Sequence, residues 1–188
     1  LTAGQLVYKG NDRQYGAYGF MNETDFDFNT SFLGNASHKL KVGYKYHYDY
    51  HHRDQQKHNF SQAVGGLITA HSSGVTFSDD RKETTKGHAV YFEDTAKFDK
   101  LELSLGARLE HFKMHYRDKV GAGTSNMEEE MTMWAPGGGL LYNHNENWQS
   151  FFGAYKGFNI PSPGTARDDG TPIEKETSLA KEIGVRYN

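Results

Sequence analysis

The sequence contains no cysteine and no run of about 18 apolar residues. The first absence excludes a disulfide scaffold, a thiolate metal site and a cysteine nucleophile, and the second excludes a transmembrane helix. Positive and negative charges are nearly balanced, since the chain has 21 Lys+Arg and 24 Asp+Glu and a formal net charge of −3. This balance excludes a strongly basic nucleic-acid binder, so we expect no nucleic-acid partner.

Aliphatic side chains are also scarce, with only 12 Leu, 4 Ile and 7 Val in 188 residues. Aromatic residues are abundant instead: the chain has 12 Phe, 12 Tyr and 2 Trp, together with 21 Gly. A chain with this composition must use its aromatic residues differently from an ordinary packed core, which is dominated by aliphatic side chains.

The strongest pattern is an alternation of apolar and polar residues with a period of two. Side chains at even positions from residue 18 to 32 are mostly aromatic, whereas Glu23, Asp25 and Asp27 share the odd positions. The same alternation follows over residues 38–50, where Leu, Val and Tyr alternate with Lys, His and Asp. Successive side chains of a strand point to opposite faces, so each segment predicts a strand with one apolar and one charged face.

This pattern predicts seven strands, at residues 12–33, 38–50, 87–98, 101–117, 131–143, 148–159 and 177–188. Their connections alternate in length: short turns lie near 34–37, 99–100 and 144–147, and long polar loops lie near 51–86, 117–130 and 160–176. In an antiparallel meander, alternate connections lie at opposite ends, so one end carries the turns and the other the loops. Outer-membrane barrels have this asymmetry, with short periplasmic turns and long extracellular loops.

A soluble β-sandwich is the alternative, but its strands are typically about 5–6 residues long. The strands predicted here are long enough to cross a bilayer, which takes about 9–11 residues. We therefore predict an all-β, antiparallel transmembrane β-barrel segment that lies in outer-membrane lipid. Its charged faces, including Lys39, Lys41 and Glu102, are expected to line the lumen.

The second half of the chain resembles TonB-dependent outer-membrane receptors. Gly106-Ala107-Arg108-Leu109-Glu110 looks like their recurrent G-x-R-x-E strand, and the chain continues with "gFxxP", a loop, "PxE" and "ExGxRY" between Gly157 and Tyr187. Within the family, the KGFNIPSPG and PIEKE stretches look most like ferric dicitrate and other siderophore receptors, although Ile160 and Thr177 depart from that pattern. The resemblance covers most of residues 80–188, and residues 1–79 share only the strand pattern.

The resemblance implies a 22-stranded barrel with an N-terminal plug and TonB box, driven by the TonB–ExbB–ExbD complex in a Gram-negative outer membrane. Neither the plug nor the TonB box is visible in this sequence. We therefore expect residues 1–188 to be an internal piece of the barrel of a longer receptor.

Two groups of side chains are candidates for ligand binding. A ferric citrate complex is anionic, and guanidinium groups bind carboxylates through paired hydrogen bonds. The candidates of this kind are Arg53, Arg81, Arg117 and Arg167 on the presumed extracellular side and Arg108 facing the lumen. Each single arginine could equally be solvated, and Arg108 could pair with Glu110.

The second group is histidine, since imidazole suits Zn, Cu, Ni or haem iron. His47, His51 and His52 are the candidate metal ligands, although adjacent His51 and His52 point opposite ways in an extended chain. The alternative is that they are solvated loop residues.

The sequence thus predicts a receptor and transporter that binds a ferric chelate as its cargo, with no other cofactor. No Ser/His/Asp motif supports hydrolysis, so we do not expect an enzyme. The alternatives are a haem or divalent-metal receptor that uses the His-rich region, and a passive porin-like barrel.

Overall fold

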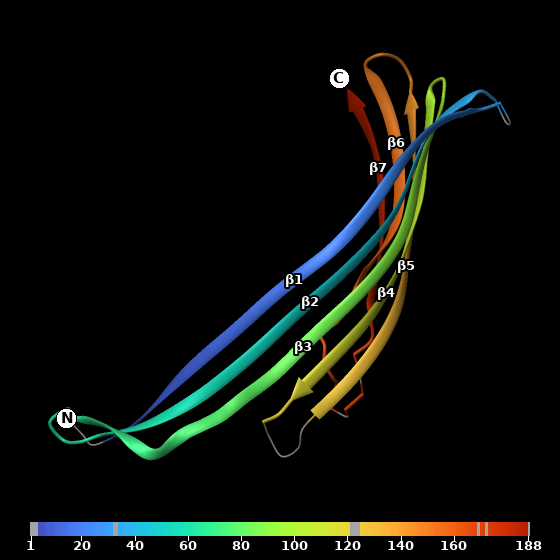
Figure 1. The fold of residues 1–188 in the computed structure, drawn as a ribbon. Helices are drawn as coiled ribbons and strands as arrows, with labels where there is room; N and C mark the ends of the chain where they lie inside the picture. Colours follow the sequence, from blue (N-terminus) through green and yellow to red (C-terminus); the bar gives the residue numbers. More distant parts are fainter. Residues whose placement is uncertain (1–3, 32–33, 121–124, 169, 172, 188) are drawn as a thin grey trace.

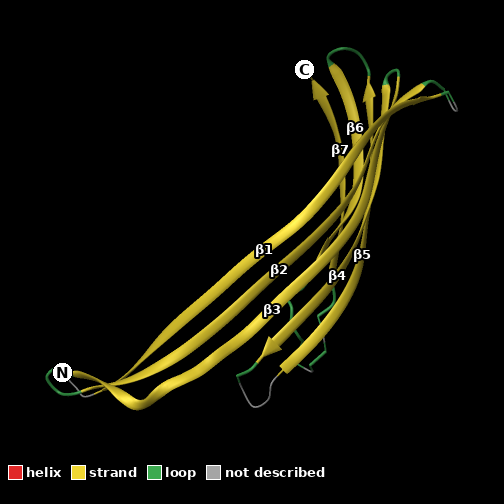
Figure 2. Ribbon diagram, in the orientation of Figure 1, coloured by secondary structure: helices red, strands yellow, loops and turns green. Residues whose placement is uncertain are grey.

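The chain folds into one antiparallel sheet of seven consecutive strands. The computed structural model describes residues 4–31, 34–120, 125–168, 170–171 and 173–187. Each strand pairs with the next one along the chain, and β1 and β7 form the two edges (Figures 1 and 2). The strands are β1 (Gly4–Thr30), β2 (Ala36–Gln62), β3 (Ile68–Phe98), β4 (Leu101–Asp118), β5 (Ser125–Asn143), β6 (Trp148–Asn159) and β7 (Glu176–Tyr187). Within these ranges, no helix is long and apolar enough to cross a membrane.

The all-β antiparallel architecture is as predicted, and successive connections lie at opposite ends of the sheet. Their lengths do not alternate throughout as predicted, because residues 31–35 between β1 and β2 and residues 63–67 between β2 and β3 are equally few. The β1–β2, β3–β4 and β5–β6 connections lie at one end of the sheet, which we call the turn end. The β2–β3, β4–β5 and β6–β7 connections lie at the opposite end, the loop end. Between β6 and β7, the described residues of the segment 160–175 lie outside the strands, in agreement with the loop predicted near 160–176.

Two of the predicted loops are largely strand. The prediction of a long loop over 51–86 is wrong, because β2 continues to Gln62 and β3 begins at Ile68. Similarly, residues 119–124 alone separate β4 from β5, instead of the predicted 117–130. The extended parts of β1, β2 and β3 project past the ends of β4 and β5 (Figure 1). Their polar sequences fold as strands because their backbones are hydrogen-bonded to neighbouring strands. β2 is paired with β1 as far as Gln62, and most of this part of β2 is also paired with β3.

One face of the sheet carries a continuous apolar band. We call this face the outer face and the other the inner face. The band covers residues 18–28, 40–50, 90–98, 101–109, 134–142, 148–154 and 183–187. The first five of these stretches have the length of about 9–11 residues that crosses a bilayer. Large side chains of the band are exposed: the exposed fraction is 60% for Phe20, 65% for Leu105 and 84% for Ile183. Soluble monomers rarely expose a continuous apolar surface of this size, whereas lipid-facing barrel strands do so throughout.

The inner face is concave and carries the small buried core. The ring of Phe158 on β6 meets the ring of Phe112 on β4 at 6.4 Å between centroids, although β5 lies between these strands in the sheet. The pairing of β5 with β6 ends at Gly137 and Tyr155, so the last residues of β6 are not held beside β5 and Phe158 reaches Phe112. Phe112, Met114 and Met133 are the large apolar residues buried there, at 5%, 1% and 2% exposure.

Candidate ligand-binding face

The loop end of the inner face carries a row of three arginines. Arg13 pairs with Arg53 across β1 and β2, and Arg53 pairs with Arg81 across β2 and β3. Like charges directly opposite one another destabilise a sheet unless opposite charges lie close by. Acidic residues in the two neighbouring rows of the same face, Asp79 and Glu83, provide that compensation.

Arg53, Arg81, Asp79, Glu83 and His51 form a connected group that we call the arginine cluster. Arg53 Nη1 lies 3.0 Å from Asp79 Oδ2, and Arg81 Nε lies 3.6 Å from Asp79 Oδ1 and 3.4 Å from Glu83 Oε1. The second oxygen of Glu83 lies 3.3 Å from His51 Nδ1. These side chains are 15–31% exposed, so water reaches the cluster only in part.

Arg13 extends the cluster toward the edge of the sheet. It is exposed, and across the described part of the chain no ion pair to its guanidinium is found. Arg53 Nε also reaches β1, where it donates to Asn11 Oδ1 at 3.2 Å. Asp118 lies directly opposite Arg81 at the next position of the row. The three arginines therefore face three carboxylates, and Arg13 is the arginine for which the described residues supply no ion pair.

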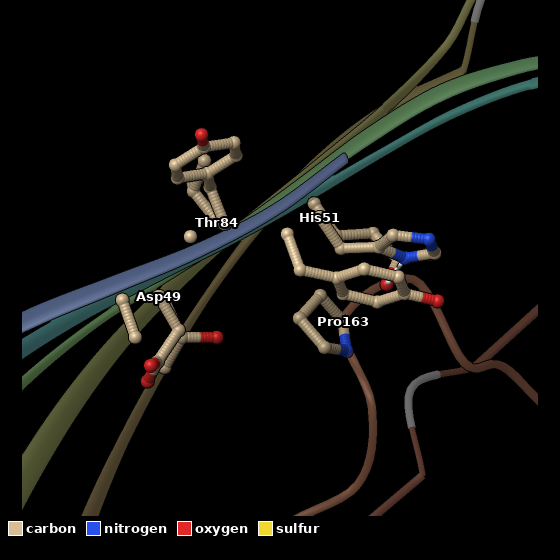
Figure 3. A pocket seen from close by; sticks show the side chains of 10 residues that line it. Asp49, His51, Thr84 and Pro163 are labelled. Carbon is tan, nitrogen blue, oxygen red and sulfur yellow. Dashed lines mark hydrogen bonds and ion pairs between the residues drawn. The ribbon is translucent and has the colours of Figure 1, made fainter. Parts of the chain in front are cut away.

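A recess of about 440 Å³ adjoins the cluster. The rings of Tyr15 and His51 stack along its wall, 4.5 Å apart and within 3° of parallel. Pro163 of the β6–β7 loop lies on the same side of the strands as His51 (Figure 3). The loop thus reaches across the inner face from β6 to β1–β3, and Gly164 lies against the ring of Tyr116.

Burial and charge modify two titratable groups outside the apolar band. Burial, and secondly the charge of Asp118, raise the pKa of Tyr116, although Arg81 opposes this effect. Burial alone would raise the pKa of Asp80, but hydrogen bonds from His52 and Lys119 outweigh it and lower that pKa. Tyr116 therefore stays a neutral donor, while Asp80 stays ionised.

The five predicted arginines lie in four different environments. Only Arg53 and Arg81 lie together. Arg108 shares the inner face but lies closer to the turn end, where its Nε is 2.7 Å from Glu110 Oε2 and its guanidinium lies 5.6 Å from the centroid of the Tyr91 ring. Arg167 is in the β6–β7 loop and donates to Thr171 Oγ1 at 3.4 Å.

Arg117 belongs to the opposite side of the sheet. It pairs with Lys82 and Asn126 in the same alternation as Leu109, so it is on the outer face. The structure therefore does not bring Arg117 together with Arg53 and Arg81, and its part in ligand binding stays a prediction. Conversely, sequence reasoning missed Arg13, whose place in the row depends on the unpredicted extension of β2 past residue 50.

The three predicted metal ligands do not gather at one point. His47 and His51 are on the inner face, whereas His52 is on the outer face, where its Nε2 lies 3.2 Å from Asp80 Oδ1. The ring of His47 covers Gly87 and meets Phe112 edge-on at 5.7 Å. Among the residues that the structure describes, no group of three or more His, Asp or Glu side chains could hold a metal ion.

Comparison with known proteins gives one family and several similar folds. The family model described as "TonB dependent receptor-like, beta-barrel" matches residues 1–188. The fold is similar to that of the ferric citrate transporter FecA in its unliganded form, with a TM-score of 0.76 and 22% identity over 96% of this chain and 26% of that one. It is also similar to the siderophore receptor PiuA from Acinetobacter baumannii, with a TM-score of 0.65 and 16% identity over 92% and 29% of the two chains.

A third similar structure is BauA, the ferric preacinetobactin receptor of Acinetobacter baumannii, with a TM-score of 0.59 and 18% identity over 98% of this chain and 28% of that one. No curated protein matches the sequence. The chain therefore spans between a quarter and a third of the length of these three structures.

Proposed function

Because the chain belongs to the TonB-dependent receptor-like β-barrel family, we propose that it is part of an outer-membrane receptor that takes up a ferric chelate with energy from the TonB–ExbB–ExbD complex. The apolar band would lie in the outer membrane, with the turn end toward the periplasm and the loop end outside the cell. The family is one of receptors and transporters, which favours energised uptake over a passive porin and over an enzyme.

The arginine cluster supports an anionic chelate, and ferric citrate is the one we propose. Guanidinium groups hold carboxylates in paired, charge-assisted hydrogen bonds. Arg13, Arg53 and Arg81 present three guanidinium groups in one row at the loop end, where a chelate would arrive from outside. This row is the single observation that carries the proposal, because it offers an arginine without an ion pair to a described residue beside two partly exposed ones on the inner face of the sheet.

Capture would exchange one set of carboxylates for another. In the unliganded chain, Arg53 and Arg81 bind Asp79 and Glu83 at distances between 3.0 and 3.6 Å. A citrate carboxylate could accept from the outward sides of the same guanidinium groups, and Arg13 would add charge without breaking an existing ion pair. The recess beside Tyr15 and His51 would hold the body of the chelate against a planar wall.

The inner face also supports a plug elsewhere in the protein. Both carboxylate oxygens of Glu129 on β5 are buried, and so are His47 Nδ1 and His51 Nε2; none of these atoms has a hydrogen-bond partner among the described residues. A buried polar group without a partner costs about 1–3 kcal/mol, and more if it is charged. We propose that groups outside residues 1–188, in a plug that fills the lumen, bind these atoms in the whole receptor.

The test is ferric citrate binding to the full receptor, measured by quenching of its intrinsic fluorescence. Arg81→Gln and Arg53→Gln should each weaken binding roughly tenfold, because hydrogen bonds to charged groups contribute about 1.5–3 kcal/mol. Arg117→Gln is the matched control, since it removes an arginine from the outer face and should leave the affinity unchanged. Equal losses in Arg81→Gln and Arg117→Gln would contradict the assignment.

The haem or divalent-metal alternative gives a different result in the same assay. His51→Ala removes one ring of the recess wall but no guanidinium group, so it should weaken ferric citrate binding less than Arg81→Gln does. Loss of Zn or haem binding in His51→Ala, with no ferric citrate binding in the wild type, would favour the alternative receptor.

A further inference from the structure

One carboxylate lies on the lipid-facing side of the apolar band, close to the turn end. Asp94 on β3 pairs with Leu40 of β2 and with Leu105 of β4, so it shares the outer face with these two leucines. It is the one charged side chain that the described residues place on that face within the band. An ionisable group among lipid-facing residues is unfavourable and is a sign of function, so its partner decides what it does.

The partner of Asp94 is His38, at the start of β2. His38 pairs directly with Phe28 of β1 and Ala96 of β3. Thr30 and Asp94 are therefore its diagonal neighbours on the same face. His38 Nδ1 lies 2.8 Å from Asp94 Oδ2, and His38 Nε2 lies 3.0 Å from Thr30 Oγ1. The ring of Phe28 stacks on the imidazole at 4.7 Å and within 1° of parallel, which holds the imidazole in this orientation.

These hydrogen bonds determine where the proton of the neutral imidazole lies. An ionised carboxylate can only accept, so His38 Nδ1 donates to Asp94. His38 Nε2 then has a free lone pair and accepts from the hydroxyl group of Thr30. A hydroxyl group, an imidazole and a carboxylate in this order are the nucleophile, the general base and the orienting acid of hydrolases that form a covalent acyl intermediate. Three strands contribute one residue each, so the sequence alone does not show this arrangement.

A hollow of about 490 Å³ lies beside the hydroxyl group, and the described residues that line it include Thr30, Asn35 and Ser37. The side-chain amide of Asn35 can donate to an oxyanion that forms there. The apolar band ends at Phe28 on β1 and begins at Leu40 on β2. The hydroxyl group of Thr30 therefore lies at the boundary between acyl chains and headgroups, which is the depth of the ester bonds of a phospholipid.

We propose that Thr30, His38 and Asp94 hydrolyse an acyl ester of a phospholipid in the periplasmic leaflet of the outer membrane. Thr30 Oγ1 would attack the carbonyl carbon while its proton passes to His38 Nε2. The bond from that carbon to the glycerol oxygen then breaks, the leaving oxygen takes the proton from Nε2, and the acyl group remains on Thr30 as an ester. A water molecule attacks this ester and gives its proton to Nε2, which returns the proton to Thr30 Oγ1 as the fatty acid leaves.

Asp94 stabilises the imidazolium that forms in both steps. Its Oδ1 has no hydrogen-bond partner among the described residues, so the charge of the carboxylate is not shared with another donor there. The side chain of His38 is only 15% exposed, so water competes little for its two nitrogens. The activity goes beyond chelate uptake and shares with it only the placement of the chain in the membrane, because the chelate would bind on the inner face.

The test is release of fatty acid by the full receptor in vesicles of phosphatidylethanolamine that carries a labelled acyl chain. Wild type should release the label and Thr30→Val should not, since valine keeps the shape of threonine without its hydroxyl group. Thr30→Ser restores a hydroxyl group and should retain the activity, which excludes misfolding as the cause of the loss. His38→Gln should lower the rate about 100-fold or more, because a general base contributes about 10²–10⁴-fold. Thr24→Val is the matched control, since Thr24 lies on the same face of β1 and pairs with Val42.

A covalent probe gives a second readout that a merely structural role would not change. A fluorophosphonate, which reacts with activated hydroxyl groups, should label Thr30 in wild type and in Thr24→Val but not in Asp94→Asn, as shown by mass spectrometry of peptides. Absence of fatty acid release in wild type overturns the proposal, and so does equal release by wild type and Thr30→Val. A label on another residue in place of Thr30 overturns the assignment of the nucleophile. Ferric citrate is absent from these assays, so their failure is distinct from a failure of the chelate proposal.

Discussion

Removing Arg108 should destabilise the receptor through the carboxylate that it leaves behind. The side chain of Glu110 is only 7% exposed, and its Oε2 lies 2.7 Å from Arg108 Nε. Breaking a buried ion pair by deleting one partner costs about 3–5 kcal/mol, because the remaining charge is uncompensated. Arg108 is itself 32% exposed, so water can partly replace it, and we expect a loss of about 3 kcal/mol for Arg108→Met.

The double variant separates the ion pair from other roles of Arg108. Arg108→Met combined with Glu110→Gln removes the buried charge, and it should recover about 2 kcal/mol of the loss, since a neutral pair in the same place needs no counter-charge. The free energy of unfolding can be measured by urea titration of the folded receptor in detergent, with tryptophan fluorescence as the signal.

Lys97 and Glu102 provide the matched control. Their charged atoms lie 2.8 Å apart on the same face, but the side chains are 52% and 30% exposed. An exposed pair contributes about 0–1 kcal/mol, so Lys97→Met should fall within that range. If Arg108→Met lowers the free energy of unfolding no more than Lys97→Met does, the Arg108–Glu110 pair does not stabilise the fold. Ligand binding would then be the better explanation for Arg108.

Two further predictions concern the membrane face and pH. Leu140→Arg introduces a charge on the outer face and should lower the free energy of unfolding by about 2 kcal/mol. Leu141→Arg, at the neighbouring position on the inner face, should lower it by less than about 1 kcal/mol. Urea titration measures both values, and equal losses would refute the assignment of faces. Because the pKa of Asp80 is lowered in the folded chain, its interactions with His52 and Lys119 stabilise the fold above the ordinary Asp pKa and are lost as pH falls through the lowered value. Thermal unfolding between pH 5 and pH 2 should therefore show a smaller loss for Asp80→Asn than for wild type, and identical curves would contradict this origin.

The membrane-crossing part of the fold could be predicted because its two faces meet different surroundings. Where lipid contacts one face and water the other, alternation fixes the strand, as it does over residues 40–50 and 101–109. That asymmetry ends beyond the band. Gln55, Gln56, Lys57 and His58 are polar on both faces, so no period of two marks them as a strand, and pairing with β1 and β3 determines their conformation.

The same reasoning explains which site residues could be placed. The face of an arginine follows from counting along its strand: Arg117 lies an even number of residues from Leu109, so the alternation in the sequence already puts it on the lipid side. Its partners do not follow in this way. Arg53 meets Asp79 and Arg81 only because β2 and β3 keep one register up to the irregularity between Gln55 and Gln56, and a slip of one residue would turn every following side chain to the other face. Residue type and position along the strand thus predict the face on which a charge lies. The arginine row forms only through the long-range pairing of three strands, and the chelate proposal depends on this row.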